Sequence, residues 1–170
     1  VLRSFKGDIS IDTETLGLNI KRDRLCLIQL RNESNKKIYL IKFDKNLSPK
    51  NSKNLKTLME DNSLTKIFHY ARFDIAVLKE NLNINVKNFF CTKVASKLIR
   101  TYSSQHGLKD LVKEILGIEL DKNEQSSDWS RNILTKKQIQ YAINDILYLS
   151  KIKINLENKL EEVGRIKTFN

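Results

Sequence analysis

The sequence contains few of the residues that break or cross-link a chain. Its 170 residues include one proline, five glycines and two cysteines, a composition that excludes a collagen-like chain and a disulfide-stapled scaffold. Apolar runs stay well short of the roughly 18 residues that a membrane-spanning helix requires, and the first residues lack the apolar core of a signal peptide. We therefore expect a soluble, cytoplasmic protein without a membrane partner, in which Cys26 and Cys91 are buried free thiols.

Negative charge is also scarce. The chain has 31 lysines and arginines against 20 aspartates and glutamates, which gives a net charge of +11. Such an excess favours a polyanionic partner such as nucleic acid. The length and the 40% hydrophobic content are sufficient for one core. Because no internal repeat or linker is present, we expect residues 1–170 to form a single domain.

The first third of the chain has the pattern of strands. Apolar residues alternate over residues 7–13 and continue through 25–30 and 38–41, with short polar connections between them. Three consecutive strands with short connections predict an antiparallel meander.

The middle of the chain alternates helical and strand patterns. Helical spacing around Leu55 is followed by a strand at 66–70, a helix at 74–82, a strand at 89–91 and a helix that includes Val94. Strands that alternate with helices predict parallel pairing.

The C-terminal half is predominantly helical. We expect a helix over 106–116 that Gly117 ends, and one long helix from 136 to about 160, with a polar loop over 121–130 between them. The T-x-x-Q pattern of residues 135–138 predicts a capping box at the start of the long helix.

Asp12 and Glu14 are the first chemically informative residues. They end an apolar strand, and because strand side chains repeat every second residue, both carboxylates lie on the same face. Like charges this close repel one another. A divalent cation such as Mg²⁺ or Mn²⁺, which prefers oxygen ligands, would remove that repulsion. The alternative is a strand end that simply enters solvent.

Two further carboxylates have defined places in helices. Asp74 lies where a strand passes into a helix, at the usual edge of a ligand crevice, although it could instead stabilise the positive end of the helix dipole. Tyr141 and Asp145 are four residues apart, on one flank of the last helix. Because that helix is mostly apolar, we expect Asp145 to be partly buried and either bound to a metal or paired with a lysine.

Together the four carboxylates predict phosphodiester chemistry. Two metal ions about 4 Å apart can activate an attacking water on one side and stabilise the leaving oxygen on the other. Tyr141 stands beside the fourth carboxylate, where its hydroxyl could hold or deprotonate that water.

Three short segments follow one another along the chain: IDTETLGL (residues 11–18), FHYARFD (68–74) and YAIND (141–145). They resemble the three exonuclease motifs of the DEDD superfamily, in the subgroup with tyrosine in the third motif. The stretch HGLKDLVKEILGIELDK (106–122), with SSDWSRNILTKKQIQYAINDILYL (126–149) after it, resembles the catalytic domain of ribonuclease D. The resemblance covers nearly the whole chain.

The resemblance implies an α/β, ribonuclease H-like fold whose central mixed sheet combines an antiparallel three-strand meander with parallel strands and is flanked by helices. It implies a 3'-5' exonuclease that uses two divalent ions, Mg²⁺ or Mn²⁺, and releases nucleoside 5'-monophosphates. By the same resemblance, the metal ligands are Asp12, Glu14, Asp74 and Asp145. Tyr141 would orient the attacking water, which makes these five the expected catalytic residues.

Nucleotide contacts are implied at further positions. Thr15 and Leu18 match family positions that meet the terminal nucleotide, where Leu18 wedges beside the last base, with packing as its alternative. Proofreading members often have asparagine where this chain has Tyr70. Tyr70 or His69 would then stack on or hydrogen-bond the nucleotide, unless His69 is an interior histidine with its own partners.

Basic and aromatic side chains are expected around the cleft. Two basic clusters should flank it, formed by Lys21, Arg22 and Arg24 near the first motif and by Arg131, Lys136 and Lys137 before the third. Trp129 either covers the rim of the cleft or anchors its loop.

The expected partner is nucleic acid with a free 3' end. The ribonuclease D-like motifs favour single-stranded RNA, and the alternative is DNA, as for a repair or proofreading exonuclease. An endonuclease on the same fold and a non-catalytic nucleic-acid-binding module are further alternatives. Tyr141 argues against the endonuclease, and the retained carboxylates argue against the module. The sequence leaves the oligomeric state open.

Overall fold

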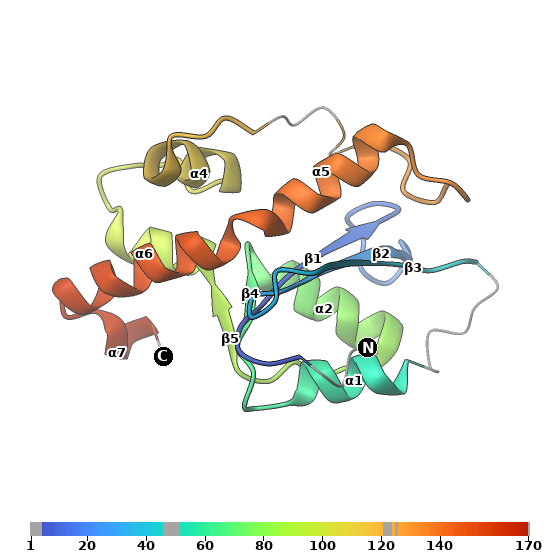
Figure 1. Cartoon of the computed structure of the whole chain (residues 1–170), viewed down its shortest axis with the longest axis horizontal. Coiled ribbons are helices and arrows are strands. Elements are labelled where there is room, and N and C mark those ends of the chain that lie inside the picture. The colour runs from blue at the N-terminus through green and yellow to red at the C-terminus, as the bar shows by residue number, and fades with distance from the viewer. Residues whose placement is uncertain (1–4, 46–51, 121–123, 125, 170) are drawn as a thin grey trace.

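The protein forms a mixed five-stranded sheet with helices on both faces (Figure 1). The computed structural model describes residues 5–45, 52–120, 124 and 126–169. The strand order is β3-β2-β1-β4-β5. The strands are β1 (Ile9–Thr15), β2 (Leu25–Asn32), β3 (Ile38–Lys42), β4 (Lys66–Phe68) and β5 (Phe89–Cys91).

The sheet has the predicted topology. Strands β1, β2 and β3 pair antiparallel as a meander, and β1, β4 and β5 pair parallel. The first strand lies two residues later than expected, at Ile9–Thr15 rather than 7–13. The fourth strand ends at Phe68 and not at Tyr70, because Tyr70 adopts a left-handed conformation (φ 70°) and begins the next helix.

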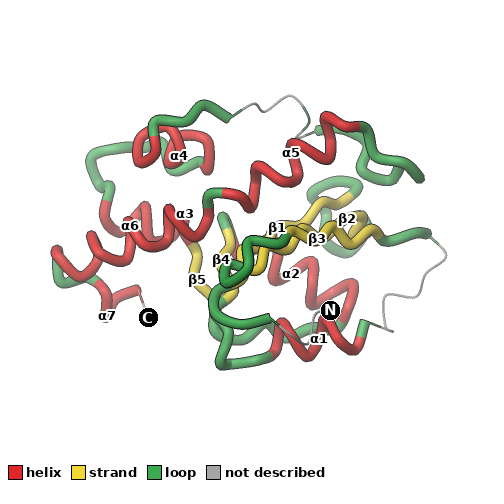
Figure 2. Tube along the Cα trace, in the orientation of Figure 1, coloured by secondary structure: helices red, strands yellow, loops and turns green. Residues whose placement is uncertain are grey.

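Helices form the two outer layers of the molecule. They are α1 (Lys53–Glu60), α2 (Ala71–Leu82), α3 (Thr92–Ile99), α4 (Leu108–Leu116), α5 (Lys136–Leu147), α6 (Leu149–Glu162) and α7 (Ile166–Phe169). Figure 2 shows α1 and α2 on one side of the sheet, and α5, α6, α3 and α4 on the other.

The side chains of β1 are divided between the two faces of the sheet. Ile9 and Ile11 are fully buried in a core with Met59 of α1 and Leu78 of α2. Each such side chain contributes about 1.5–3 kcal/mol through burial. The intervening residues of β1, which include Asp12, lie on the opposite face, toward α5. The apolar face therefore anchors the strand, while the other face is left for polar side chains.

The long C-terminal helix predicted over 136–160 is in fact two helices. Helix α5 ends at Leu147 and α6 begins at Leu149, with Tyr148 between them in a conformation (φ −107°, ψ −6°) that departs from a regular helix. Arg31 of β2 donates a hydrogen bond from Nη1 to the carbonyl oxygen of Leu147 at 3.0 Å. The prediction was wrong because the helical spacing of apolar residues continues across the break. The side chain that bonds the backbone there, Arg31, belongs to a strand far away in the sequence.

The other helix signals agree with the structure. Gln138 N–H donates to Thr135 Oγ1, and Thr135 N–H donates to Gln138 Oε1, so the predicted capping box is formed. Gly117 ends α4 with φ 68°, a conformation that glycine adopts without steric cost. Helix α4 begins at Leu108 rather than residue 106. Part of the predicted 121–130 loop, residues 121–123 and 125, lies outside the described residues.

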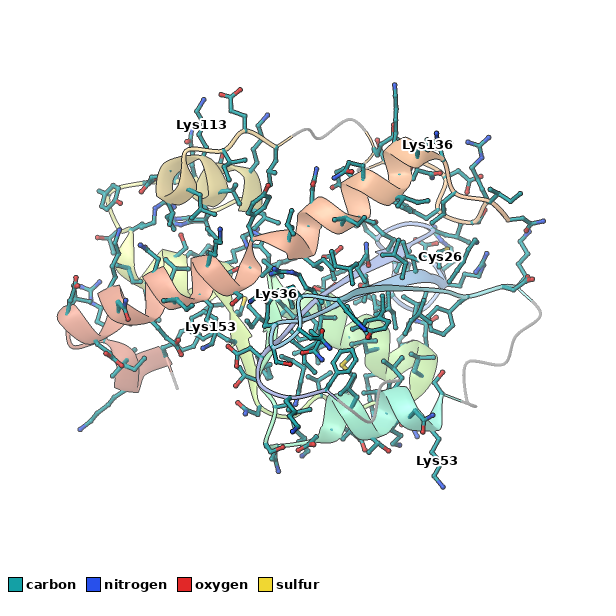
Figure 3. The ribbon with its side chains drawn as sticks, viewed as in Figure 1. Cys26, Lys36, Lys53, Lys113, Lys136 and Lys153 are labelled. Carbon is teal, nitrogen blue, oxygen red and sulfur yellow. The ribbon has the colours of Figure 1, made fainter. Side chains whose placement is uncertain are left out.

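The basic side chains are spread over the molecule. In Figure 3, Lys36, Lys53, Lys113 and Lys136 extend from different parts of the fold, rather than from one stripe. Cys26 and Cys91 are both buried free thiols, as predicted. None of the helices in the described ranges is long and apolar enough to span a membrane.

Candidate active site

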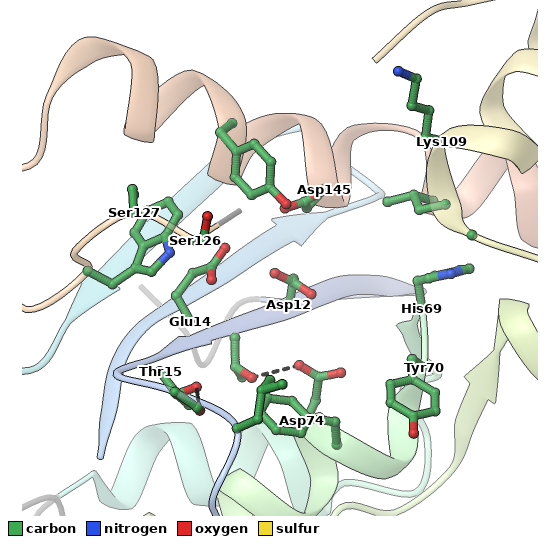
Figure 4. Close-up of a pocket in the computed structure, with 18 of the residues that line it drawn as sticks. Asp12, Glu14, Thr15, His69, Tyr70, Asp74, Lys109, Ser126, Ser127 and Asp145 are labelled. Atoms are coloured by element: carbon green, nitrogen blue, oxygen red, sulfur yellow. Dashed lines mark hydrogen bonds between the residues drawn. The ribbon is translucent and has the colours of Figure 1, made fainter. Parts of the chain in front are cut away.

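A cavity of about 720 Å³ opens at the carboxyl ends of the parallel strands. Its lining comes from the end of β1, the β4–α2 turn, the start of α3, the start of α4, a loop before α5, and α5 itself. Ligand sites of α/β proteins commonly lie at this edge of a sheet. Figure 4 shows Asp12 and Glu14 entering the cavity from β1, with Asp145 facing them from α5.

Three carboxylates converge in this cavity. Asp12, Glu14 and Asp145 each offer an oxygen, and these oxygens lie within 4.8 Å of one another. The alternation of β1 places the first two on one face, as predicted, and that face lies toward α5. The strand therefore does not simply enter solvent at Glu14, because α5 covers this face of β1.

Asp74 lies at the opposite wall of the same cavity. It belongs to the first turn of α2, is only 3% exposed, and its Oδ1 accepts a hydrogen bond from the Thr13 hydroxyl at 2.6 Å. Asp74 is not part of the three-residue group, but its charge raises the pKa of Asp12. The four predicted carboxylates thus surround one space.

The carboxylates carry strongly raised pKa values. Burial, followed by the charges of Asp74, Asp145 and Glu14, raises the pKa of Asp12 well above its ordinary value. Burial and the same kind of repulsion raise the pKa of Glu14 to about 9. Burial raises the pKa values of Asp74 and Asp145 to about 7. These shifts reflect the energetic cost of burying several negatively charged carboxylates close together.

The arrangement fits a divalent metal ion. The donor set consists of carboxylate oxygens, which hard cations such as Mg²⁺ and Mn²⁺ prefer. A bound cation would offset the repulsion that the raised pKa values reflect. No lysine or arginine side chain is hydrogen-bonded or ion-paired to these four carboxylates in the described part of the chain, so the predicted alternative of a lysine partner for Asp145 is not observed.

Gln29 was missed by the sequence analysis. It is fully buried in β2, directly opposite Asp12 in the strand register. Its Nε2 lies 3.4 Å from Asp12 Oδ2, a long hydrogen bond, and its donation to Glu14 lowers the pKa of that carboxyl. Only knowledge of the β1–β2 register could have identified this residue.

Tyr141 faces the carboxylates from one turn before Asp145 on α5. Its hydroxyl hydrogen-bonds Asp145 and thereby lowers the pKa of that carboxyl. Burial, followed by the charges of Asp145, Glu14 and Asp12, raises the pKa of Tyr141 above its ordinary value. The phenol therefore keeps its proton at neutral pH.

All four predicted nucleotide-contact residues line the cavity. Leu18 is 84% exposed and so is not a packing residue. Thr15 donates its hydroxyl hydrogen to the Gly17 carbonyl at 2.6 Å. The ring of Tyr70 is 47% exposed, and the ammonium of Lys93 lies 4.4 Å from its centroid.

The His69 ring is held by protein partners of its own. Nδ1 lies 2.9 Å from Thr92 Oγ1, and the ring also hydrogen-bonds the backbone of His106. Burial and the nearby charge of Lys93 lower the pKa of His69 to about 3. This residue matches the interior histidine with its own partners that the sequence analysis kept as an alternative.

Among the residues that the structure describes, two lysines that were not predicted bring positive charge to the cavity wall. Lys93 and Lys109 line it, whereas none of the six basic residues predicted to flank the cleft does. Arg22 is instead ion-paired with Asp23, and Arg24 donates to the Phe43 carbonyl. The signal for Lys93 was its position just after β5, at the carboxyl edge of the parallel strands.

Trp129 both lines the cavity and anchors its loop. The indole is 2% exposed, and its ring centroid lies 6.0 Å from that of Tyr141. Gln138 of α5 donates from Nε2 to Ser127 Oγ and to the Asp128 carbonyl, which holds the loop against the helix. The two interpretations of Trp129 are therefore compatible.

The curated relatives of the chain include ribonuclease D enzymes and a DNA polymerase I. Ribonuclease D of Sphingobium indicum is 33% identical over 92% of this chain and 39% of its own length. DNA polymerase I of Aquifex aeolicus is 29% identical over 90% of this chain and 24% of its own length. The chain thus spans well under half the length of the curated relatives it matches.

Solved structures show the same similarity in three dimensions. A structure described as the apo form of a nuclease is 43% identical, with a TM-score of 0.93 over 98% of this chain and 79% of that chain. Brucella melitensis NrnC bound to pGG is 45% identical, with a TM-score of 0.88 over 95% and 76% of the two chains. Escherichia coli RNase D is 28% identical, with a TM-score of 0.82 over 97% and 42%.

These matches confirm the predicted ribonuclease H-like exonuclease fold. The sequence profile of the family described as 3'-5' exonuclease matches residues 1–161. The chain therefore belongs to the 3'-5' exonuclease family.

Proposed function

We propose that the chain is a metal-dependent exonuclease that hydrolyses phosphodiester bonds from the 3' end of nucleic acid, with RNA favoured, and releases nucleoside 5'-monophosphates. The observation that carries this proposal is the convergence of Asp12, Glu14 and Asp145 within 4.8 Å. Asp74 and Tyr141 line the same cavity. These five residues are the catalytic residues of the proposal.

The carboxylates and Tyr141 have separate roles in this reaction. Two Mg²⁺ or Mn²⁺ ions held by Asp12, Glu14, Asp74 and Asp145 would supply Lewis acidity and neutralise charge on the phosphodiester. The Tyr141 hydroxyl, beside Asp145, orients the attacking water by hydrogen bonding. Thr13 keeps the Asp74 carboxylate directed into the cavity through its 2.6 Å hydrogen bond.

The other walls of the cavity suit the end of a strand. The exposed Leu18 side chain can wedge beside the terminal base, and Thr15 lines the same cavity. Tyr70 offers a half-exposed ring for stacking. Lys93 and Lys109 supply positive charge for the phosphate groups. His69 is assigned to holding the cavity wall.

RNA is the favoured substrate because of the relatives. Several are ribonuclease D enzymes, and the Brucella nuclease was solved with pGG. DNA is the second candidate, since the DNA polymerase I relative matches the same region. We further propose that residues 1–170 are one exonuclease domain and that it acts in the cytoplasm, where reduced thiols such as Cys26 and Cys91 persist.

Product analysis on labelled strands tests the proposal. RNA and DNA of matched sequence, labelled at the 5' end, are incubated with the protein and Mg²⁺, and the released nucleotides are identified by mass spectrometry. We expect a ladder that shortens from the 3' end, faster for RNA, together with nucleoside 5'-monophosphates.

Three other outcomes would overturn parts of the proposal. Internal cuts would identify an endonuclease. A retarded but intact strand would identify a binding module. Faster shortening of DNA than of RNA would reverse the substrate assignment but retain the chemistry.

A further inference from the structure

A buried polar network lies beside the catalytic cavity, where α5 meets the sheet. Arg31 of β2 donates from Nη1 to the Leu147 carbonyl at 3.0 Å and to Glu33 Oε2 at 2.7 Å. Glu33 also accepts hydrogen bonds from the Ser10 hydroxyl at Oε1 (2.6 Å) and from Lys36 Nζ at Oε2 (3.2 Å). The side chains of Arg31 and Glu33 are 13% and 6% exposed. The network therefore joins β1, β2 and the end of α5 out of contact with most solvent.

The chain positions of these contacts connect the network to the carboxylates. Ser10 precedes Asp12 by two residues on the same face of β1, and Leu147 follows Asp145 by two residues on α5. Arg31 lies directly opposite Ser10 in the β1–β2 register. The network thus links the strand that carries Asp12 to the helix that carries Asp145, close to both residues.

The carboxylates themselves push these two elements apart. Oxygens of Asp12, Glu14 and Asp145 lie within 4.8 Å of one another, so their like charges repel across the gap between β1 and α5 when no cation lies between them. Arg31 opposes that separation because it brings a cation to the carboxyl end of α5, where the helix dipole is negative. It also satisfies a carbonyl in the last turn, at the break before α6.

We propose that Arg31, held in place by Glu33, is a positioning residue that sets the distance between Asp12 and Asp145 and so determines the affinity of the site for divalent metal. Mg²⁺ requires near-ideal oxygen geometry, so a small displacement of α5 weakens its binding. The inference rests on the proposed function, because Arg31 acts only through the carboxylates assigned there.

Direct metal binding tests this role. Mn²⁺ binding to the full chain is measured by calorimetry for the wild type and for Arg31→Met, which keeps an unbranched apolar side chain but removes the charge and the donors. Replacing partners that orient metal ligands typically weakens metal affinity by about 10- to 100-fold. We expect a shift of this size in the Mn²⁺ dissociation constant, with a matching shift in the Mg²⁺ concentration needed for half-maximal cleavage. At saturating Mg²⁺, KM for the strand should be unchanged.

Lys153→Met provides a matched control. The Lys153 side chain is 12% exposed and is ion-paired with Asp8 and with Glu157 of α6, but it has no contact with α5 among the described hydrogen bonds and ion pairs. This variant should lower the melting temperature without changing Mn²⁺ affinity. Glu33→Gln, which retains an acceptor but not the charge, should weaken Mn²⁺ binding less than Arg31→Met does.

The outcomes separate this inference from the proposed function. Wild-type Mn²⁺ affinity in Arg31→Met, with a lowered melting temperature, would show that the network only stabilises the fold and would overturn the inference. If Arg31→Met does not fold, wild-type affinity in Glu33→Gln overturns it in the same way. A wild-type protein that binds Mn²⁺ but cleaves no strand overturns the proposed function, while the affinity shift in the variants still decides the role of Arg31.

Discussion

Tyr141 and the carboxylates have different tasks in the proposed reaction, although they line the same cavity. The carboxylates have raised pKa values because they are buried and repel one another, and a bound cation would relieve that repulsion. Tyr141 has a raised pKa for the related reason that a phenolate would add another negative charge to the same space. A neutral hydroxyl beside Asp145 is suited to orienting water.

Replacing Tyr141 by phenylalanine tests that assignment. Tyr141→Phe keeps the ring and its packing against Trp129 but removes the hydroxyl. We expect the single-turnover rate to fall by about 10²- to 10⁴-fold, the usual contribution of a group that positions or transfers a proton, while strand affinity and Mn²⁺ affinity stay close to wild type.

Tyr102→Phe is the control for this substitution. The Tyr102 hydroxyl donates to Glu114, and the residue is 74% exposed and does not line the cavity, so the rate should not change. A wild-type rate in Tyr141→Phe would assign Tyr141 to packing, and a loss of strand binding would make it a substrate contact.

The residues found from the sequence alone were those whose geometry is local. Asp12 and Glu14 share a face because of strand alternation, and Tyr141 and Asp145 share a flank because of helical spacing. Gln29 could not be found in this way, because its contact with Asp12 depends on the pairing of two strands. Lys109 was also missed, because only the tertiary structure brings the start of α4 to the cavity.

At the scale of elements, α5 has three connections that place it over the sheet. Its N-terminus is closed by the capping box, its first turn holds the Trp129 loop through Gln138, and its C-terminus is held by Arg31. The start of α5 was predicted because the capping signal is local. Its end at Leu147 was not, because apolar residues continue at helical spacing into α6 and the contact with Arg31 spans 116 residues of sequence.

The contributions of Thr135 and Gln138, the two residues of the capping box, can be distinguished by mutation. Thr135→Ala removes the cap, at a typical cost of about 1 kcal/mol, and leaves the bonds from Gln138 to the loop. Gln138→Ala removes both the box and those bonds. We expect both variants to lower the free energy of unfolding, as measured by urea denaturation, but only Gln138→Ala to raise KM, because it releases the loop that lines the cavity.

Thr135→Ala is thus the matched control for the effect on KM. An unchanged KM in Gln138→Ala would show that the loop keeps its place without this tether. An equal rise of KM in both variants would indicate that the start of α5, rather than the loop, affects substrate binding.

For the whole molecule, the acidic site makes stability depend on pH when metal is absent. The folded-state pKa of Glu14 is about 9, and those of Asp74 and Asp145 are about 7, all above the ordinary values of the unfolded chain. Between those ordinary values and the raised ones, the folded state binds more protons than the unfolded state. The free energy of unfolding therefore falls as pH rises through this range.

The interval from about pH 7 to about pH 8 isolates this effect. The lowered pKa of His69 makes the free energy of unfolding rise with pH, but only below the ordinary pKa of 6.5. Burial lowers the pKa of Lys66 to about 8, which also makes the free energy of unfolding rise with pH, mainly above pH 8. In chelator, the free energy of unfolding from urea denaturation should be lower at pH 8 than at pH 7, and Mg²⁺ should restore it.

Glu14→Gln is the internal comparison for this prediction. It removes one repelling charge, so the variant should be more stable than wild type at pH 8 in chelator and should gain less from Mg²⁺. Stability that rises from pH 7 to pH 8 in chelator would contradict the repulsion inferred from the geometry.

The central claim, that gathered carboxylates bind metal to cut nucleotides from a 3' end, is tested most directly by metal-dependent release of nucleoside 5'-monophosphate. Protein stripped with chelator is given an RNA strand labelled at its 3'-terminal nucleotide, and Mg²⁺ is titrated in. Wild-type protein and Asp61→Asn, a carboxylate variant outside the cavity, should show no release without metal and full release with it. Asp12→Asn should stay folded and release almost nothing at any Mg²⁺ concentration. Release that persists in chelator, or near-wild-type release by Asp12→Asn, would contradict the claim.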